Sequence, residues 1–218
     1  MPYIVRPRRF PSRALAACSA LLLIGAVPAQ AAKRSTEQAE KPITEASITE
    51  ASQCVEPALT QPFLYAGDSN WYTLTPGQTP GNFAGTGWTL TGGASITKAT
   101  LQNGQTGSVL DLPSGAKAVS PSFCITSDYP TARTIIRNVV GASGVYFYVS
   151  YLGTSTWDTP KNTGQTHGEG NGAWTVPAAV NMQPYNVPGW QVVRITLIGG
   201  GTTNDYQLYN LYVDPYRR

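Results

Sequence analysis

The chain has 218 residues, of which only 12% are charged, and its formal net charge is +3 at pH 7. The positive excess lies in residues 1–31, which carry four arginines and no acid, whereas residues 54–218 carry eight basic and eight acidic side chains. Because a nucleic-acid partner needs a basic footprint, this neutral body excludes nucleic-acid binding.

Residues 1–31 have the pattern of a secretory signal peptide. A basic start is followed by an apolar run over residues 14–27 and by the small residues Ala29-Gln30-Ala31, where a signal peptidase would cut. The run is shorter than the roughly 20 apolar residues that span a bilayer. The sequence therefore predicts a secreted, extracellular protein with no transmembrane segment after cleavage. Arg8-Arg9 also fits twin-arginine export, which stays open.

Residues 32–53 separate this leader from the rest of the chain. They contain the direct repeat "ITEAS" twice and no aromatic residue. Such a segment cannot bury enough apolar surface to offset the entropy lost on ordering. We expect a disordered tether here, followed by one domain over residues 54–218.

Two cysteines, Cys54 and Cys124, remain once the leader with Cys18 is removed. An even pair in an exported chain predicts a disulfide, which would add about 4 kcal/mol in the chain-entropy model. Two cysteines and one histidine at these spacings do not match a metal-binding pattern. We expect neither a metal nor a cofactor.

Strand signals recur along the body, separated by Gly, Pro, Asn and Ser clusters, while helix signals are nearly absent. The predicted strands lie at residues 70–75, 87–92, 94–100, 108–113, 116–121, 133–139, 145–152, 172–176, 190–199 and 206–215. Many short strands joined by turns predict an all-β fold, an antiparallel β-sandwich of the jelly-roll type.

Alternation assigns the faces of the later strands. In residues 190–199 and 145–152 the odd-numbered side chains are predicted to face the core. In residues 206–215 strict alternation places Leu208 on the wrong side, which indicates a bulge near Tyr209-Asn210. Pro215 cannot donate to a ladder, so this closing strand ends there.

Several motifs taken together resemble a group of uncharacterised secreted bacterial β-sandwich proteins whose chains end in YVDP-x-RR. The motifs are "QPF", "GWTLTGGA", "SPSFC", "DYPTARTIIRN" and "YVDPYRR". The chain is also remotely similar to jelly-roll carbohydrate-binding modules and galactose-binding-like domains, in its "GWTLTGGA" block and its last strand. That resemblance implies glycan binding. An acidic pair in that strand often helps to hold calcium in such domains, but Tyr209-Asn210 stand in its place here, so no calcium is expected.

Residues suited to catalysis are few. His167 lies in the glycine-rich stretch "TGQTHGEGNG" beside Glu169, and the two could join a metal or acid–base site, but a solvated loop histidine is the preferred interpretation. No spacing enforces the two carboxylates of a glycosidase, and no serine lies in a nucleophile elbow. The sequence predicts a protein that is not an enzyme.

Aromatic residues are the candidate ligand-binding side chains. Tyr146 and Tyr148 share one strand face, about 6.5–7 Å apart, which suits stacking on neighbouring units of a glycan. Trp157 and Trp174 bracket the His167 stretch and would add platforms. The alternative for these four residues is ordinary packing across strands. For two further tryptophans, Trp88 and Trp190, packing is the preferred interpretation.

Arg133 and Arg137 lie four residues apart and therefore on one strand face. They would either grip the carboxylate of an acidic sugar or pair internally, for instance with Asp128 or Asp214. Two functions remain. The first is a secreted, non-catalytic protein that binds extracellular glycan, and the second is a structural or adhesive envelope protein that binds another protein.

Overall fold

The computed structural model describes residues 54–126, 130–153, 155–183 and 189–215. The predicted signal peptide (1–31), tether (32–53) and terminal Arg217-Arg218 lie outside these ranges. Strands dominate the described residues, together with one short 3₁₀ helix, η1 (Leu64–Ala66). Within this part of the chain, no helix has the length and apolar character needed to cross a membrane.

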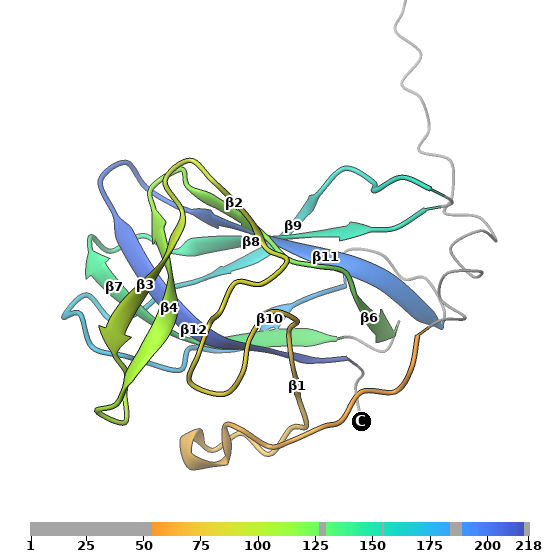
Figure 1. Cartoon of the computed structure of the whole chain (residues 1–218), viewed down its shortest axis with the longest axis horizontal. Helices are drawn as coiled ribbons and strands as arrows, with labels where there is room; N and C mark the ends of the chain where they lie inside the picture. The colour runs from red at the N-terminus through yellow and green to blue at the C-terminus, as the bar shows by residue number, and fades with distance from the viewer. Residues whose placement is uncertain (1–53, 127–129, 154, 184–188, 216–218) are drawn as a thin grey trace, which may run out of the picture. The chain divides into compact units, whose positions relative to one another are not determined.

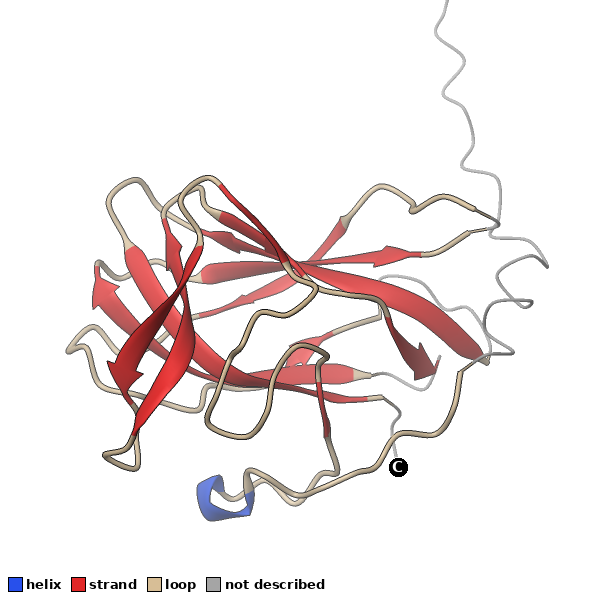
Figure 2. Cartoon of the chain, viewed as in Figure 1, coloured by secondary structure: helices blue, strands red, loops and turns tan. Residues whose placement is uncertain are grey.

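In the described part of the chain, twelve strands form two six-stranded antiparallel sheets (Figures 1 and 2). Sheet one has the order β10 (Val180–Asn181), β7 (Thr131–Val140), β12 (Asp205–Asp214), β4 (Thr106–Pro113), β3 (Ser95–Thr100), and β1 (Thr73–Leu74) also pairs with β12. Sheet two has the order β2 (Thr89–Thr91), β5 (Lys117–Val119), β11 (Trp190–Gly199), β8 (Val145–Tyr151), β9 (Lys161–Thr166), and β6 (Phe123–Thr126) also pairs with β11.

The path of the chain between the sheets is that of a jelly roll. From β4 the chain crosses to β5 and β6, returns to β7, crosses to β8 and β9, returns to β10, and ends with β11 in sheet two and β12 in sheet one. The last two strands lie in the middle of their sheets, and β8 and β9 form a hairpin within sheet two. This double-sheet arrangement confirms the predicted jelly-roll sandwich.

The core lies between the sheets, and the predicted faces are confirmed. Val193, Ile195 and Leu197 of β11 are fully buried, as are the odd-numbered residues of β8 up to Val149. The even-numbered Tyr146 and Tyr148 are only half-buried on the opposite side of β8.

The predicted bulge is present in β12. The register against β7 shifts between Tyr209 and Tyr212, and Asn210 has φ 53°. The extra residue allows both Leu208 and Leu211 to reach the core, where each is fully buried, while Tyr209 turns to the outer face. The side chain of Asn210 stabilises the bulge, because its Oδ1 accepts the Gly81 N–H at 2.7 Å.

The predicted disulfide joins Cys54 to Cys124, with their Cα atoms 5.8 Å apart. That separation is typical of native disulfides. The bond ties the first described residue to β6 in sheet two.

The strand predicted at residues 172–176 differs in position. Residues 172–176 form no continuous strand; only Thr175 makes an isolated bridge, to Ile136, and the strand β10 begins at Val180. Pro177, which has no N–H to donate, interrupts the pairing in between.

Candidate ligand-binding site

A pocket of about 540 Å³ opens on the outer face of sheet one. Its walls come from segments far apart in the sequence: the loop that contains η1, the turn between β3 and β4, and the strands β7 and β12. The polar and aromatic lining residues are Tyr65, Gln102, Asn103, Gln105, Tyr209 and Asn210.

The floor of the pocket is largely apolar and buried. Ile135 and Tyr209 are register partners on neighbouring strands, and with Leu101 they are more than nine-tenths buried. Trp174 meets the Tyr209 ring edge-on at 4.9 Å. The Tyr209 hydroxyl accepts the Gln102 N–H at 3.3 Å. Burial raises the pKa of Tyr209, so this hydroxyl keeps its proton at neutral pH.

Tyr65 forms the rim. Its side chain is 63% exposed, and its hydroxyl donates to Gln102 Oε1 at 3.1 Å. The ring is therefore held at one edge while most of its surface stays open to a ligand.

The loop over residues 60–72, called here the 60–72 loop, positions Tyr65. Thr60 and Tyr72 close it with two backbone hydrogen bonds of 2.7 and 2.8 Å. Phe63 anchors it, because its buried ring packs edge-on against Tyr72 at 5.3 Å and Tyr212 at 5.5 Å. The loop is thereby fixed to the outer face of sheet one, since Tyr212 lies on β12.

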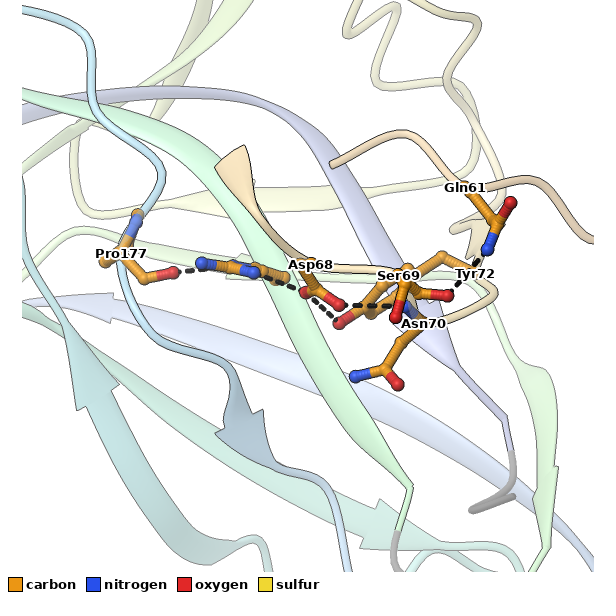
Figure 3. A network of polar contacts seen from close by, with 7 residues as sticks. Gln61, Asp68, Ser69, Asn70, Tyr72 and Pro177 are labelled. Atoms are coloured by element: carbon orange, nitrogen blue, oxygen red, sulfur yellow. Dashed lines mark hydrogen bonds and ion pairs between the residues drawn. The ribbon is translucent and has the colours of Figure 1, made fainter. Parts of the chain in front are cut away.

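An ion pair between Asp68 and Arg133 adds a polar tie between the 60–72 loop and β7. Tyr72 donates its hydroxyl to Asp68 Oδ2 at 2.7 Å, and Arg133 Nε donates to the Pro177 carbonyl at 2.7 Å. Figure 3 shows this network, with Asp68 and Tyr72 pointing toward one another. Both charged side chains are at least 86% buried.

These contacts shift the pKa values of Asp68 and Tyr72, the two ionisable partners on the 60–72 loop. Burial opposes the charge on Asp68, but the hydrogen bonds from Asn70, Tyr72 and Arg133 and the Arg133 charge outweigh it, so the pKa of Asp68 is lowered. Burial, followed by the hydrogen bond to Asp68, raises the pKa of Tyr72 to about 12. The network is therefore an ionised carboxylate held by a cation and a protonated phenol.

The pocket itself is neutral. No Asp, Glu, His, Lys or Arg is among the described residues that line it. Its chemistry rests on amide groups, two tyrosines and apolar side chains. Such a surface binds uncharged polar molecules that also present apolar faces.

The four residues predicted to bind ligand lie on two different sheets. Trp174 packs beside the pocket on sheet one, where its Nε1 donates to the Thr100 carbonyl at 2.8 Å. Tyr146 and Tyr148 lie on the outer face of sheet two. Trp157 lies there too, in a bridge with Leu152, and the Arg194 guanidinium is 4.5 Å from its ring centroid. The structure thus brings three of them to one face and separates the fourth.

The other candidate residues make mostly internal contacts. Arg133 pairs with Asp68. Asp128, one of the two acids named from the sequence, lies outside the described residues. Arg137 donates twice to Gln207 Oε1, at 3.0 and 2.6 Å, and covers the Trp174 ring at 4.6 Å. His167 is exposed, with its Nδ1 3.2 Å from the Gly168 carbonyl oxygen. Among the described residues, no three His, Cys, Asp or Glu side chains gather to hold a metal.

Sequence reasoning missed the residues that form the pocket. Tyr65 comes from an irregular loop, and Gln102 and Gln105 from a turn, so neither shows a periodic pattern. A usable signal was the concentration of amide side chains in the turn "LQNGQT", over residues 101–106.

No family model matches the chain, and no curated protein matches it in sequence. Among solved structures, the chain is similar to the CBM22-1 xylan-binding domain of Paenibacillus barcinonensis Xyn10C, with a TM-score of 0.38 and 14% identity over 61% of this chain and 88% of that one. It is also similar to TmCBM61 in complex with β-1,4-galactotriose (TM-score 0.37, 13% identity, 64% and 92% covered). A third is a family 11 carbohydrate-binding module of Clostridium thermocellum (TM-score 0.35, 10% identity, 60% and 88% covered). At these values the likeness is loose and does not say where a ligand would bind.

Proposed function

We propose that this protein is an extracellular, non-catalytic glycan-binding domain whose site is the pocket on sheet one. The observation that carries the proposal is the exposed Tyr65 ring beside amide side chains in a neutral lining. Sugar hydroxyls both donate and accept hydrogen bonds, as amides do, and the C–H face of a sugar ring packs on an aromatic ring. The pocket offers both kinds of contact within one small volume.

Two features support the remaining parts of the proposal. A disulfide is typical of an oxidising compartment outside the cytoplasm, which agrees with the predicted signal peptide. A glycosidase needs two carboxylates across its substrate, and the lining of this pocket offers amides in place of acids. Binding without hydrolysis is therefore the function that this lining favours.

Tyr65→Ala tests the proposal, with binding measured on a glycan array and then by titration with the best oligosaccharide found. Loss of the ring should weaken binding about five- to tenfold, because an aromatic contact contributes about 1–1.5 kcal/mol. Since the side chain is largely exposed, the thermal unfolding temperature should stay unchanged. Full affinity in the Tyr65→Ala variant would remove the pocket from consideration.

The outer face of sheet two is the second candidate, because Tyr146 and Tyr148 lie half-buried along one side of β8 and Trp157 lies on the same face. Tyr146→Ala and Tyr148→Ala serve as matched aromatic truncations. We expect them to bind glycan normally. If they lose binding while Tyr65→Ala keeps it, the site belongs to sheet two.

If no glycan is retained by the protein, and cross-linking in cells recovers a protein that sugars do not displace, the envelope-protein hypothesis is correct instead.

A further inference from the structure

The amide groups of the pocket are engaged unequally, and Asn210 shows this most simply. Its Oδ1 accepts the Gly81 backbone N–H at 2.7 Å. A backbone N–H only donates, so this contact fixes which side of the amide is the oxygen. The Nδ2 group has no hydrogen-bond partner among the described residues, and it stays available as a donor.

The turn between β3 and β4 has the same arrangement. Asn103 Oδ1 accepts the Gln105 backbone N–H at 3.0 Å, which turns Asn103 Nδ2 toward Gln105 Oε1 at 3.2 Å. The oxygen of Gln105 thereby already accepts one hydrogen bond. Its Nε2 group has no partner in the described part of the chain.

Gln102 and Tyr209 complete the set. Gln102 Oε1 accepts the Tyr65 hydroxyl, and its Nε2 is left without a partner within the described ranges. The Tyr209 oxygen accepts the Gln102 N–H, and its own proton remains free to donate. The raised pKa of Tyr209 keeps that proton in place at neutral pH.

The polar side chains of the pocket therefore offer unpaired donors, while each of their amide oxygens already accepts one hydrogen bond. Next to these donors lie the apolar side chains of Leu101 and Ile135, both nearly buried at the floor. A complementary ligand group has a strong hydrogen-bond acceptor to meet these donors, and carries a small apolar part.

An acetyl group meets this description, since its carbonyl oxygen accepts and its methyl group is apolar. A carboxylate also accepts, but the described lining has no cation to pair with it, and burying an unpaired charge is costly. Resting on the proposed glycan function, we propose that the pocket selects an acetylated neutral sugar unit, carrying either an acetamido group or an O-acetyl ester.

Titration calorimetry with two matched ligand pairs tests this selectivity. The first pair is the hexamer of N-acetylglucosamine and the hexamer of glucose. The second is an O-acetylated xylo-oligosaccharide before and after removal of its esters with mild alkali. We expect the acetylated member of at least one pair to bind at least about tenfold tighter, since its carbonyl gains a hydrogen bond and its methyl is buried. The pair that shows the difference identifies the amide or the ester as the source of the group.

Two isosteric variants connect the selectivity to the donors. Gln105→Glu and Asn210→Asp each keep the engaged oxygen and replace the free NH₂ by an oxygen. The ratio of acetylated to unacetylated affinity should fall about five- to tenfold in each. Asn181→Asp on β10 is the control: Asn181 is exposed, its Oδ1 accepts the Gln183 N–H at 2.7 Å, and it lies outside the pocket lining. The same change of charge there should leave the ratio unaltered.

The outcomes separate this inference from the function on which it rests. Equal affinity within both pairs overturns the acetyl selectivity and leaves glycan binding standing. Tighter binding of the unacetylated members overturns it as well. If the ratio of acetylated to unacetylated affinity falls equally in Asn181→Asp, the added charge alone explains the effect, and the acetyl selectivity is overturned. If no oligosaccharide binds, and the Tyr65→Ala assay finds no binding to lose, both proposals fail.

Discussion

Asp68 joins two parts of the molecule that are distant in sequence. Its carboxylate takes hydrogen bonds from the Asn70 N–H and the Tyr72 hydroxyl within the 60–72 loop and pairs with Arg133 on β7. The same loop holds Tyr65 at the rim of the pocket. An ionised Asp68 therefore contributes both to folding and to the position of a binding residue.

We expect Asp68→Asn to lower the free energy of unfolding by about 2 kcal/mol at pH 7, the typical contribution of hydrogen bonds to a charged group. Because the folded-state pKa of Asp68 lies below its ordinary value of 3.8, its stabilising effect is fully present above that value. The effect is lost as the pH falls through the lowered pKa. Urea unfolding of both proteins between pH 7 and pH 3 measures this. The difference between their free energies of unfolding should shrink below about pH 4.

Glu169→Gln is the control for this measurement, because Glu169 is exposed in the loop after β9. It removes one carboxylate without touching the network. The assigned ion pair would be contradicted if Asp68→Asn and the original protein differed in free energy of unfolding by the same amount from pH 7 down to pH 3.

At the scale of the element, the bulge in β12 determines which residues reach the pocket. Without it, Tyr209 would point to the same side as Leu211 and Val213, and the pocket would lose its floor. Asn210 holds the positive φ that the bulge requires, a conformation that Asn and Gly adopt more readily than other residues.

Two substitutions at this position separate backbone strain from the side-chain hydrogen bond. Asn210→Gly and Asn210→Ala both lose the bond to Gly81, but only alanine carries a Cβ into the left-handed region. The alanine variant should therefore be less stable than the glycine variant by about 1 kcal/mol in urea unfolding. Equal stability would mean that the bulge relaxes when the asparagine is removed.

The sequence predicts strands well where apolar residues alternate and poorly where pairing alone makes the strand. The bounds of β11 agree with the prediction, since Val193, Ile195 and Leu197 show a clear period of two. By contrast, β9 was missed, because "KNTGQT" has no apolar residue. It is a strand because β8 offers it an unpaired edge, which is a property of the sheet rather than of the segment.

The pocket could not be predicted for a related reason. Its residues come from a loop, a turn and two strands that meet only in the folded protein. Which amide oxygens already accept a hydrogen bond and which NH₂ groups are free depends on single contacts, such as the one from Gly81 to Asn210. Such contacts leave no trace in a sequence pattern. The shared strand face of Tyr146 and Tyr148 could be predicted because alternation places both side chains on one side of β8.

At the scale of the whole molecule, the disulfide is the covalent link between the two ends of a long stretch of chain. Replacing both cysteines, as Cys54→Ser with Cys124→Ser, should lower the free energy of unfolding by about 4 kcal/mol, because the unfolded chain regains the freedom of a loop with a sequence separation of 70. Circular dichroism should show an unchanged strand content with a lower melting temperature. An unchanged melting temperature would mean that the bond contributes no net stability.

The disulfide also determines where tension would travel if the chain were stretched. A pull on Cys54 enters β6 directly through Cys124, and β6 lies beside the end of β12, where Thr126 donates two hydrogen bonds to the Pro215 carbonyl, at 2.8 and 3.0 Å. The load therefore passes between neighbouring strand ends and bypasses the residues enclosed by the disulfide. Tyr65 and the turn at 102–105 lie within that enclosed stretch, so the mouth of the pocket would keep its form while the ends of the domain are under strain.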